Sequence, residues 1–273
     1  MNIATLVENT TVAPEYKPAH GLCLYIATKR HKLLFDLGPG ALFLENAAKL
    51  GVDVAAVDTV ILSHVHIDHG GALGALLKHN HTAKVYIQKT AFEKHYTKVL
   101  GIPVNIGIDD AFMEHPQVVL TDEKLVIDDE LTLFADVTGK ECGSASNDAL
   151  FAKHAGKMEP DDFSHEHSLI ITEDGKHTLI AGCAHKGIIN IQKRAEERVG
   201  AELDCVISGF HLYNPVTKRC EEDALVREVA ARLKTHRTRY YTCHCTGPRA
   251  FALLREELGD QMNDLATGSR IEI

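Results

Sequence analysis

The residues best suited to chemistry lie in one short segment, Ser63-His64-Val65-His66-Ile67-Asp68-His69-Gly70-Gly71. Side chains two positions apart in an extended segment point the same way, so His64 and His66 are placed to bind one metal ion. The turn that follows carries Asp68 and His69 to a neighbouring position. Imidazole and carboxylate ligands together suit zinc, manganese or iron. Four such side chains within six positions favour a metal site over a solvated strand end.

Further histidines follow predicted strands in the second half of the chain. These are His185, His211 and His244. The segment from His64 likewise follows a predicted buried strand, Asp58–Ser63. Chemistry in layered α/β folds collects at the carboxyl ends of strands. We therefore expect histidines from both halves of the chain to meet at one shared site.

The elements that must position these side chains alternate along the chain. Short runs rich in β-branched and aromatic residues alternate with helical stretches, which is typical of a layered α/β fold. A helix is predicted over Ala91–Val99. Two excursions, near residues 90–116 and 138–166, are expected to shape a pocket, because long loops inside compact domains are commonly functional. We expect residues 1–273 to form a single domain.

Composition limits the classes of partner. The chain has 273 residues, a formal charge of −9 and 45% hydrophobic residues, which is typical of a globular protein. The acidic balance weighs against nucleic acid, and no apolar run approaches the roughly 20 residues that span a bilayer. The N-terminus does not resemble a signal peptide, and seven cysteines form an odd set. We expect a cytoplasmic protein with a small-molecule substrate, and leave its oligomeric state open.

The histidine segment resembles the HxHxDH signature of the metallo-β-lactamase superfamily. This resemblance implies an αββα sandwich, with two mixed sheets flanked by helices. Further segments are similar to one branch of that superfamily, the branch of 7,8-dihydropterin-6-methyl-4-(β-D-ribofuranosyl)aminobenzene-5′-phosphate synthase. They are His20-Gly21-Leu22, Leu34-Phe35-Asp36-Leu37-Gly38, Asn46-Ala47 with Leu50-Gly51, Gly182-Cys183-Ala184-His185 with Gly187-Ile188, Gly209-Phe210-His211-Leu212 and Cys243-His244-Cys245-Thr246-Gly247.

The resemblance implies two groups of metal ligands. The first group is His64, His66 and His185, and the second is Asp68, His69 and His244. Where many hydrolases of the superfamily place a metal-bridging aspartate, this chain has Ser208-Gly209-Phe210-His211. His211 is then either a replacement ligand or a group that contacts substrate or carries a proton, and we favour the second role.

Three cysteines near the ligand histidines invite a metal interpretation. Cys243 and Cys245 flank His244, so in an extended segment both face away from the side that His244 uses. Cys183 lies among small residues before His185. We expect structural burial, and no metal ligation, for all three cysteines.

Several polar residues outside the motif have open roles. Glu166 is a candidate substrate contact, whereas its neighbours His165 and His167 are expected in a solvated turn. Asp36 is predicted either to orient a ligand histidine or to cap a turn. His20 is placed near the mouth of the site by the resemblance, and His95 is expected at the surface.

The sequence thus predicts a metal-dependent hydrolase of a small ester, lactone, thioester or phosphoester. The nucleophile is a metal-bound hydroxide, which Asp68 orients while His211 protonates the leaving group. One or two zinc ions are expected, with manganese or iron as alternatives. The alternative functions are a pterin-related phosphate synthase, as the branch suggests, a mononuclear-iron oxidoreductase and a non-catalytic binding protein.

Overall fold

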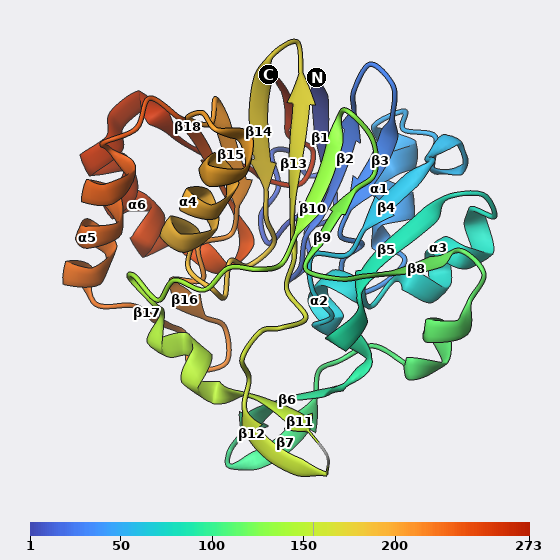
Figure 1. Cartoon of the computed structure of the whole chain (residues 1–273), viewed down its shortest axis with the longest axis horizontal. Coiled ribbons are helices and arrows are strands. Elements are labelled where there is room, and N and C mark those ends of the chain that lie inside the picture. Colours follow the sequence, from blue (N-terminus) through green and yellow to red (C-terminus); the bar gives the residue numbers. More distant parts are fainter. Residues whose placement is uncertain (155) are drawn as a thin grey trace.

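Two seven-stranded mixed sheets face each other in the computed structural model, which describes residues 1–154 and 156–273. Helices cover the outer face of each sheet (Figure 1). The strand order is β20-β1-β2-β3-β4-β5-β8 in the first sheet and β19-β18-β15-β14-β13-β10-β9 in the second. The predicted αββα sandwich is confirmed.

The first sheet comes almost entirely from the first half of the chain. Its strands are β1 (Asn2–Val7), β2 (Cys23–Ala27), β3 (Lys32–Phe35), β4 (Thr59–Ile61), β5 (Lys84–Gln88), β8 (Val118–Thr121) and the C-terminal β20 (Arg270–Glu272). The helices of this half are α1 (Leu42–Lys49), α2 (Ile67–Gly70) and α3 (Leu73–His79). Strands β3, β4, β5 and β8 run parallel, so their carboxyl ends meet at one edge.

The second sheet repeats this plan with the second half of the chain. Its strands are β9 (Lys124–Val126), β10 (Leu131–Phe134), β13 (Ser168–Glu173), β14 (Lys176–Ile180), β15 (Cys205–Ser208), β18 (Arg239–Thr242) and β19 (Met262–Asp264). The outer helices are α4 (Ile188–Val199), α5 (Asp223–Leu233) and α6 (Pro248–Leu258). Strands β14, β15, β18 and β19 are parallel, and their carboxyl ends form the second wall of the site.

Apolar side chains fill the space between the sheets. Leu24 and Phe35 from the first sheet pack in one cluster with Leu169 and Ile207 from the second. All four are fully buried. Burial of one such side chain contributes about 1.5–3 kcal/mol. This shared core holds the two sheets together, and with them the two walls of the site.

The two excursions pair with each other in a smaller sheet of order β12-β11-β6-β7 below the sandwich (Figure 1). It contains β6 (Lys94–Val99), β7 (Ile102–Asn105), β11 (Leu150–His154) and β12 (Lys157–Pro160). The helix predicted over Ala91–Val99 is wrong. Burial alternates along β6, with His95 and Thr97 inward, because this run is rich in β-branched and aromatic residues and pairs with β11.

The remaining elements are short. A two-stranded ribbon joins β16 (Tyr213–Asn214) to β17 (Arg219–Cys220). Single 3₁₀ turns lie at Val54–Ala56, Lys89–Phe92, Asp110–Glu114, Ala145–Ala149, His244–Thr246 and Gly259–Gln261. Within residues 1–154 and 156–273, every helix lacks the length and apolar character that crossing a membrane requires.

Candidate metal centre

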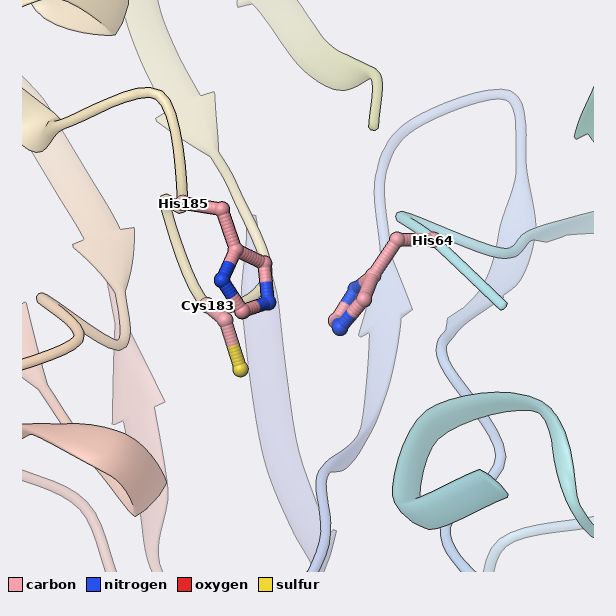
Figure 2. A group of neighbouring side chains, drawn as sticks. All are labelled: His64, Cys183 and His185. Atoms are coloured by element: carbon pink, nitrogen blue, oxygen red, sulfur yellow. The ribbon is translucent and has the colours of Figure 1, made fainter. Parts of the chain in front are cut away.

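The predicted ligands from both halves of the chain lie together beyond the carboxyl ends of the parallel strands. His64 follows β4, and Asp68 and His69 lie in α2. His185 follows β14, and His244 follows β18. Figure 2 shows His64 and His185 approaching each other from opposite walls of the site. The fold thus brings together residues that are more than 100 positions apart in the sequence.

The first predicted group, His64, His66 and His185, forms a compact triangle of imidazoles. The ring centroids are 4.6 Å apart for His64 and His66, and 5.0 Å for either of them and His185. All three side chains are buried, and none of their Nε2 atoms has a hydrogen-bond partner among the described residues. Burial and the neighbouring histidines hold the pKa values of all three well below the ordinary range. Neutral, buried and unpartnered Nε2 atoms are the donor set that a divalent metal ion requires.

The second predicted group, Asp68, His69 and His244, adjoins the first. Asp68 Oδ2 lies 3.1 Å from His244 Nε2 and 3.8 Å from His69 Nε2. His20 Nε2 lies 3.3 Å from the same oxygen, at the mouth of the site as expected. Burial opposes the charge of Asp68, but these three histidines hold its pKa well below the ordinary value. A carboxylate and two imidazoles within reach of one another fit a second divalent ion.

Hydrogen bonds at Nδ1 orient four of these imidazoles. The Nδ1 partners are Ser63 Oγ for His64 (2.9 Å), Asp36 Oδ2 for His69 (2.7 Å), Asn147 Oδ1 for His185 (3.0 Å) and Asn9 Oδ1 for His244 (2.9 Å). Carboxylate and amide oxygens only accept, and the Ser63 hydroxyl donates to Asp36, so each Nδ1 carries the proton. The Nε2 lone pairs therefore all face the centre, as metal ligands must.

Asp36 links the two groups of ligands. Its fully buried carboxylate accepts hydrogen bonds from the Ser63 backbone N–H (2.7 Å), the Ser63 hydroxyl (2.8 Å) and His69 Nδ1 (2.7 Å). Of the two roles predicted for Asp36, the structure shows the orienting one. Asn9 and Asn147 act similarly on His244 and His185, but they lie on distant loops and carry no sequence signal of their own.

Cys183 is buried, as predicted, and its sulfur lies among the ligand histidines. Its Sγ atom lies 3.2 Å from His69 Nε2 and within 4.8 Å of ligand atoms of His64, His185 and His244. Figure 2 shows Cys183 on the same wall of the site as His185, with its sulfur below the ring of His185 in this view.

His211 lies at the boundary between the metal centre and a cavity. Its ring centroid is 4.1 Å from that of His185, and neither ring nitrogen has a partner among the described residues. Its backbone is left-handed (φ 49°), a costly conformation for a non-glycine residue. The backbone N–H of His211 donates to Cys245 Sγ at 3.3 Å, which helps to hold that conformation. Cys243 and Cys245 are buried, as predicted.

Glu166 has a different place from the one predicted. Its carboxylate accepts hydrogen bonds from the backbone N–H groups of His185 (2.7 Å) and Lys186 (3.0 Å). Both oxygens are thereby used, and Glu166 is buried outside the residues that line the cavity. Glu166 therefore fixes the loop that carries His185, and a contact with substrate stays a prediction.

A third buried group, missed at the level of sequence, flanks His66. His95 Nδ1 lies 2.8 Å from Asp161 Oδ2, and His165 Nε2 lies 3.3 Å from the same atom. The rings of His66 and His165 are 5.3 Å apart. The expectations of a surface His95 and a solvated His165 are wrong, because the small sheet and the loop after it cover both. The alternation of residues along the β6 segment was the one sequence signal that could have predicted the burial of His95.

Replacing Asp161 by asparagine is expected to destabilise the protein by about 3 kcal/mol, because two buried imidazoles lose their shared carboxylate. The measurement is the free energy of unfolding in urea. Asp162→Asn, at the exposed neighbouring position, is the matched control and should change that free energy by less than about 0.5 kcal/mol. Equal effects of the two variants would contradict the assigned role of Asp161.

His167 is buried, so the expectation of a solvated turn is wrong for this residue too, and its burial predicts a pH dependence of stability. Burial lowers its pKa to about 4, against about 6.5 in an unfolded chain. Between these values the unfolded state binds the extra proton, so the stability present above pH ~6.5 is lost as the pH falls towards ~4. When the pH is lowered from ~7.5 to ~5, the free energy of unfolding of the metal-free wild type should fall by about 2 kcal/mol more than that of His167→Gln. Urea unfolding at both pH values measures this, with exposed His81→Gln as the control; equal losses in wild type and His167→Gln would contradict it.

A cavity of about 300 Å³ opens beside both groups of ligands. Six polar residues of the centre line it: His20, His66, Asp68, His185, His211 and His244. Its apolar wall includes Ile67, Ile106, Leu150, Pro215 and Val216. Among the described residues that line it, none is lysine or arginine.

Comparison with known proteins places this geometry in a family. The sequence model of the metallo-β-lactamase superfamily matches residues 16–193. An uncharacterized protein of Methanocaldococcus jannaschii is 26% identical over 97% of this chain and 96% of its own length. From the same organism, 7,8-dihydropterin-6-methyl-4-(β-D-ribofuranosyl)-aminobenzene-5′-phosphate synthase is 24% identical over 93% of this chain and 90% of its own length.

Solved structures share the fold along the whole chain. A metal-dependent hydrolase of the β-lactamase superfamily has a TM-score of 0.82 and 24% identity, covering 100% of this chain and 99% of its own. An isothiocyanate hydrolase from Delia radicum gut bacteria has a TM-score of 0.56 and 17% identity, with coverage of 100% and 99%. The two facing sheets, the ligand groups at their shared edge and the match of the family model agree: the chain belongs to the metallo-β-lactamase superfamily.

Proposed function

We propose that this protein is a metal-dependent hydrolase of compact esters, lactones, thioesters or phosphoesters. The observation that carries the proposal is the set of buried, unpartnered Nε2 atoms of His64, His66 and His185 beside an open cavity. Asp68, His69 and His244 would hold a second ion. Divalent ions held by these side chains would lower the pKa of a bound water and polarise the carbonyl or phosphoryl oxygen of the substrate.

The chain supplies two further groups for proton transfer. Asp68 lies on the cavity wall, and its carboxylate can accept a hydrogen bond from the attacking water and so orient it. His211 lines the same cavity with both ring nitrogens unpartnered among the described residues. In its protonated form His211 can donate a proton to the leaving group.

The lining of the cavity favours one part of this substrate range. A phosphate group is commonly bound by arginine, lysine or a helix N-terminus. This cavity offers no lysine or arginine among its described lining residues, and Ile67, Ile106, Leu150, Pro215 and Val216 form an apolar part of its wall. Its volume of about 300 Å³ suits a small ligand. An uncharged ester, thioester or lactone with a short apolar acyl group therefore fits best.

The test compares substrates that share a leaving group. Metal-loaded protein is assayed with 4-nitrophenyl acetate, butyrate and phosphate, alongside short lactones and thioesters, before and after chelation. We expect kcat/KM to be at least about tenfold higher for a carboxylic ester than for the phosphate, a difference of about 1.4 kcal/mol. Chelation should abolish both reactions, and zinc or manganese should restore them.

Two outcomes would redirect the assignment. Hydrolysis at an unchanged rate after chelation would end the proposal of a metal-dependent hydrolase. Inactivity on every ester, with turnover of a phosphate-bearing pterin, would favour a reaction related to that of the relative named as a synthase.

A further inference from the structure

The sulfur of Cys183 occupies the middle of the metal centre. Its Sγ forms one group with His64 and His185, and another with His69 and His244, and in each group the ligand atoms lie within 4.8 Å of one another. Among the described residues, Cys183 is thus the one common to a group from each half of the centre. Its side chain is only 3% exposed.

The distances suit coordination as well as packing. A tetrahedral zinc ion with N and S ligands at about 2.05 and 2.3 Å separates those atoms by about 3.5 Å. Cys183 Sγ and His69 Nε2 are 3.2 Å apart. The lone pair of this Nε2 faces the sulfur, because the Nδ1 of His69 donates its proton to Asp36. Both atoms are therefore aimed at the same small volume.

Charge gives a second, independent argument. Two divalent ions bring four positive charges into a largely buried site, whereas Asp68 is the single carboxylate in the two predicted ligand groups. Uncompensated charge in a buried site is costly. A thiolate adds negative charge at the point where the two groups meet, and its soft sulfur is a common zinc ligand.

Cys245 also has its sulfur within 4.8 Å of ligand atoms of Cys183 and His211, but its hydrogen bonds are made to the backbone. Its sulfur accepts a hydrogen bond from the backbone N–H of His211 at 3.3 Å and donates one to the carbonyl oxygen of Cys183 at 3.5 Å. The thiol of Cys245 is thus already used within the protein, both as a hydrogen-bond acceptor and as a donor. The sulfur of Cys183 instead contacts an imidazole nitrogen, His69 Nε2 at 3.2 Å, and lies within 4.8 Å of ligand atoms of His64, His185 and His244.

We propose that Cys183 is a metal ligand whose thiolate is shared between the His64–His66–His185 group and the Asp68–His69–His244 group. Binding releases the thiol proton to solvent. The inference rests on the metal centre of the proposed function and is independent of the substrate.

Cobalt substitution tests the proposal without an activity assay. Protein freed of metal is titrated with Co²⁺, and absorption is recorded in the visible region for cobalt binding and in the near ultraviolet for sulfur-to-cobalt charge transfer. We expect both signals in the wild type. Bound cobalt without a charge-transfer band in the wild type would overturn the role of Cys183 and leave the metal centre intact. Failure of the wild type to bind cobalt would overturn both.

Two cysteine variants assign the band. Cys183→Ser should lose the charge-transfer band and bind cobalt at least about tenfold more weakly, because even outer partners of metal ligands contribute 10–100-fold. Cys245→Ser, at the neighbouring sulfur, should keep the band. An undiminished band and affinity in Cys183→Ser would overturn the proposal. If Cys183→Ser does not fold, the test rests on the other two spectra. A charge-transfer band that is present in the wild type and kept in Cys245→Ser shows that the bound sulfur is not that of Cys245.

Discussion

Replacing His66 by alanine is expected to lower kcat/KM for an activated ester by about 10³-fold, or about 4 kcal/mol, the scale of a metal ion's electrostatic contribution. The first ligand group has three buried Nε2 atoms, none with a partner among the described residues, and His66 supplies one of them. Without it, the ion loses a third of its predicted protein ligands in the first group. Metal content and kcat/KM should therefore fall together, measured on the same preparation.

The matched control for His66 is another histidine outside the centre. His79 is exposed at the end of α3, and His79→Ala should change neither metal content nor rate. A His66→Ala protein that retains full hydrolysis would show that the reaction does not use this metal centre.

Replacing Asp36 by asparagine is expected to weaken metal binding 10- to 100-fold and to destabilise the metal-free protein by about 3 kcal/mol. The carboxylate accepts three hydrogen bonds in a fully buried position. An amide of the same shape would set an N–H group against one of those donors. The orientations of His64, through Ser63, and of His69 would change together.

Two measurements separate the effects of Asp36→Asn. Competition with a chelator gives the metal affinity, and urea unfolding of the metal-free protein gives the stability. Asp129→Asn, at a fully exposed carboxylate, is the control and should change neither. Unchanged metal affinity in Asp36→Asn would contradict the view that Asp36 orients both groups of ligands.

The parts of this site that are local in sequence were predictable. His64, His66, Asp68 and His69 lie within six positions, so the geometry of a strand followed by a turn specifies where each side chain points. The strand-end positions of His185 and His244 follow from the alternation of strands and helices. The same alternation predicted a layered α/β fold, and the resemblance to the metallo-β-lactamase superfamily implied the αββα sandwich.

The parts that depend on pairing between distant segments were not predictable. His95 becomes buried because β6 pairs with β11, where Ala152 lies opposite His95. The same packing buries His165 and brings Asp161 between the two histidines. No local pattern specifies that register.

Loop conformation accounts for the other differences between the predicted site and the observed one. Ala184 has φ 56°, and this left-handed residue lies between Cys183 and His185 in a turn that turns both side chains towards the centre. Glu166 appears polar and available in the sequence, yet it fixes the backbone of that turn from outside the cavity. Gly182, just before the turn, has no room for a side chain, because a Cβ atom there would lie 2.1 Å from Ser63 Oγ.

The most direct test of the central claim is the metal content of protein purified without added metal, measured together with its rate of ester hydrolysis before and after chelation. The two ligand groups predict one to two equivalents of a divalent transition metal per chain, with hydrolysis lost on chelation and restored by zinc or manganese. Metal-free protein that hydrolyses the ester at the original rate would contradict a hydrolytic metal centre.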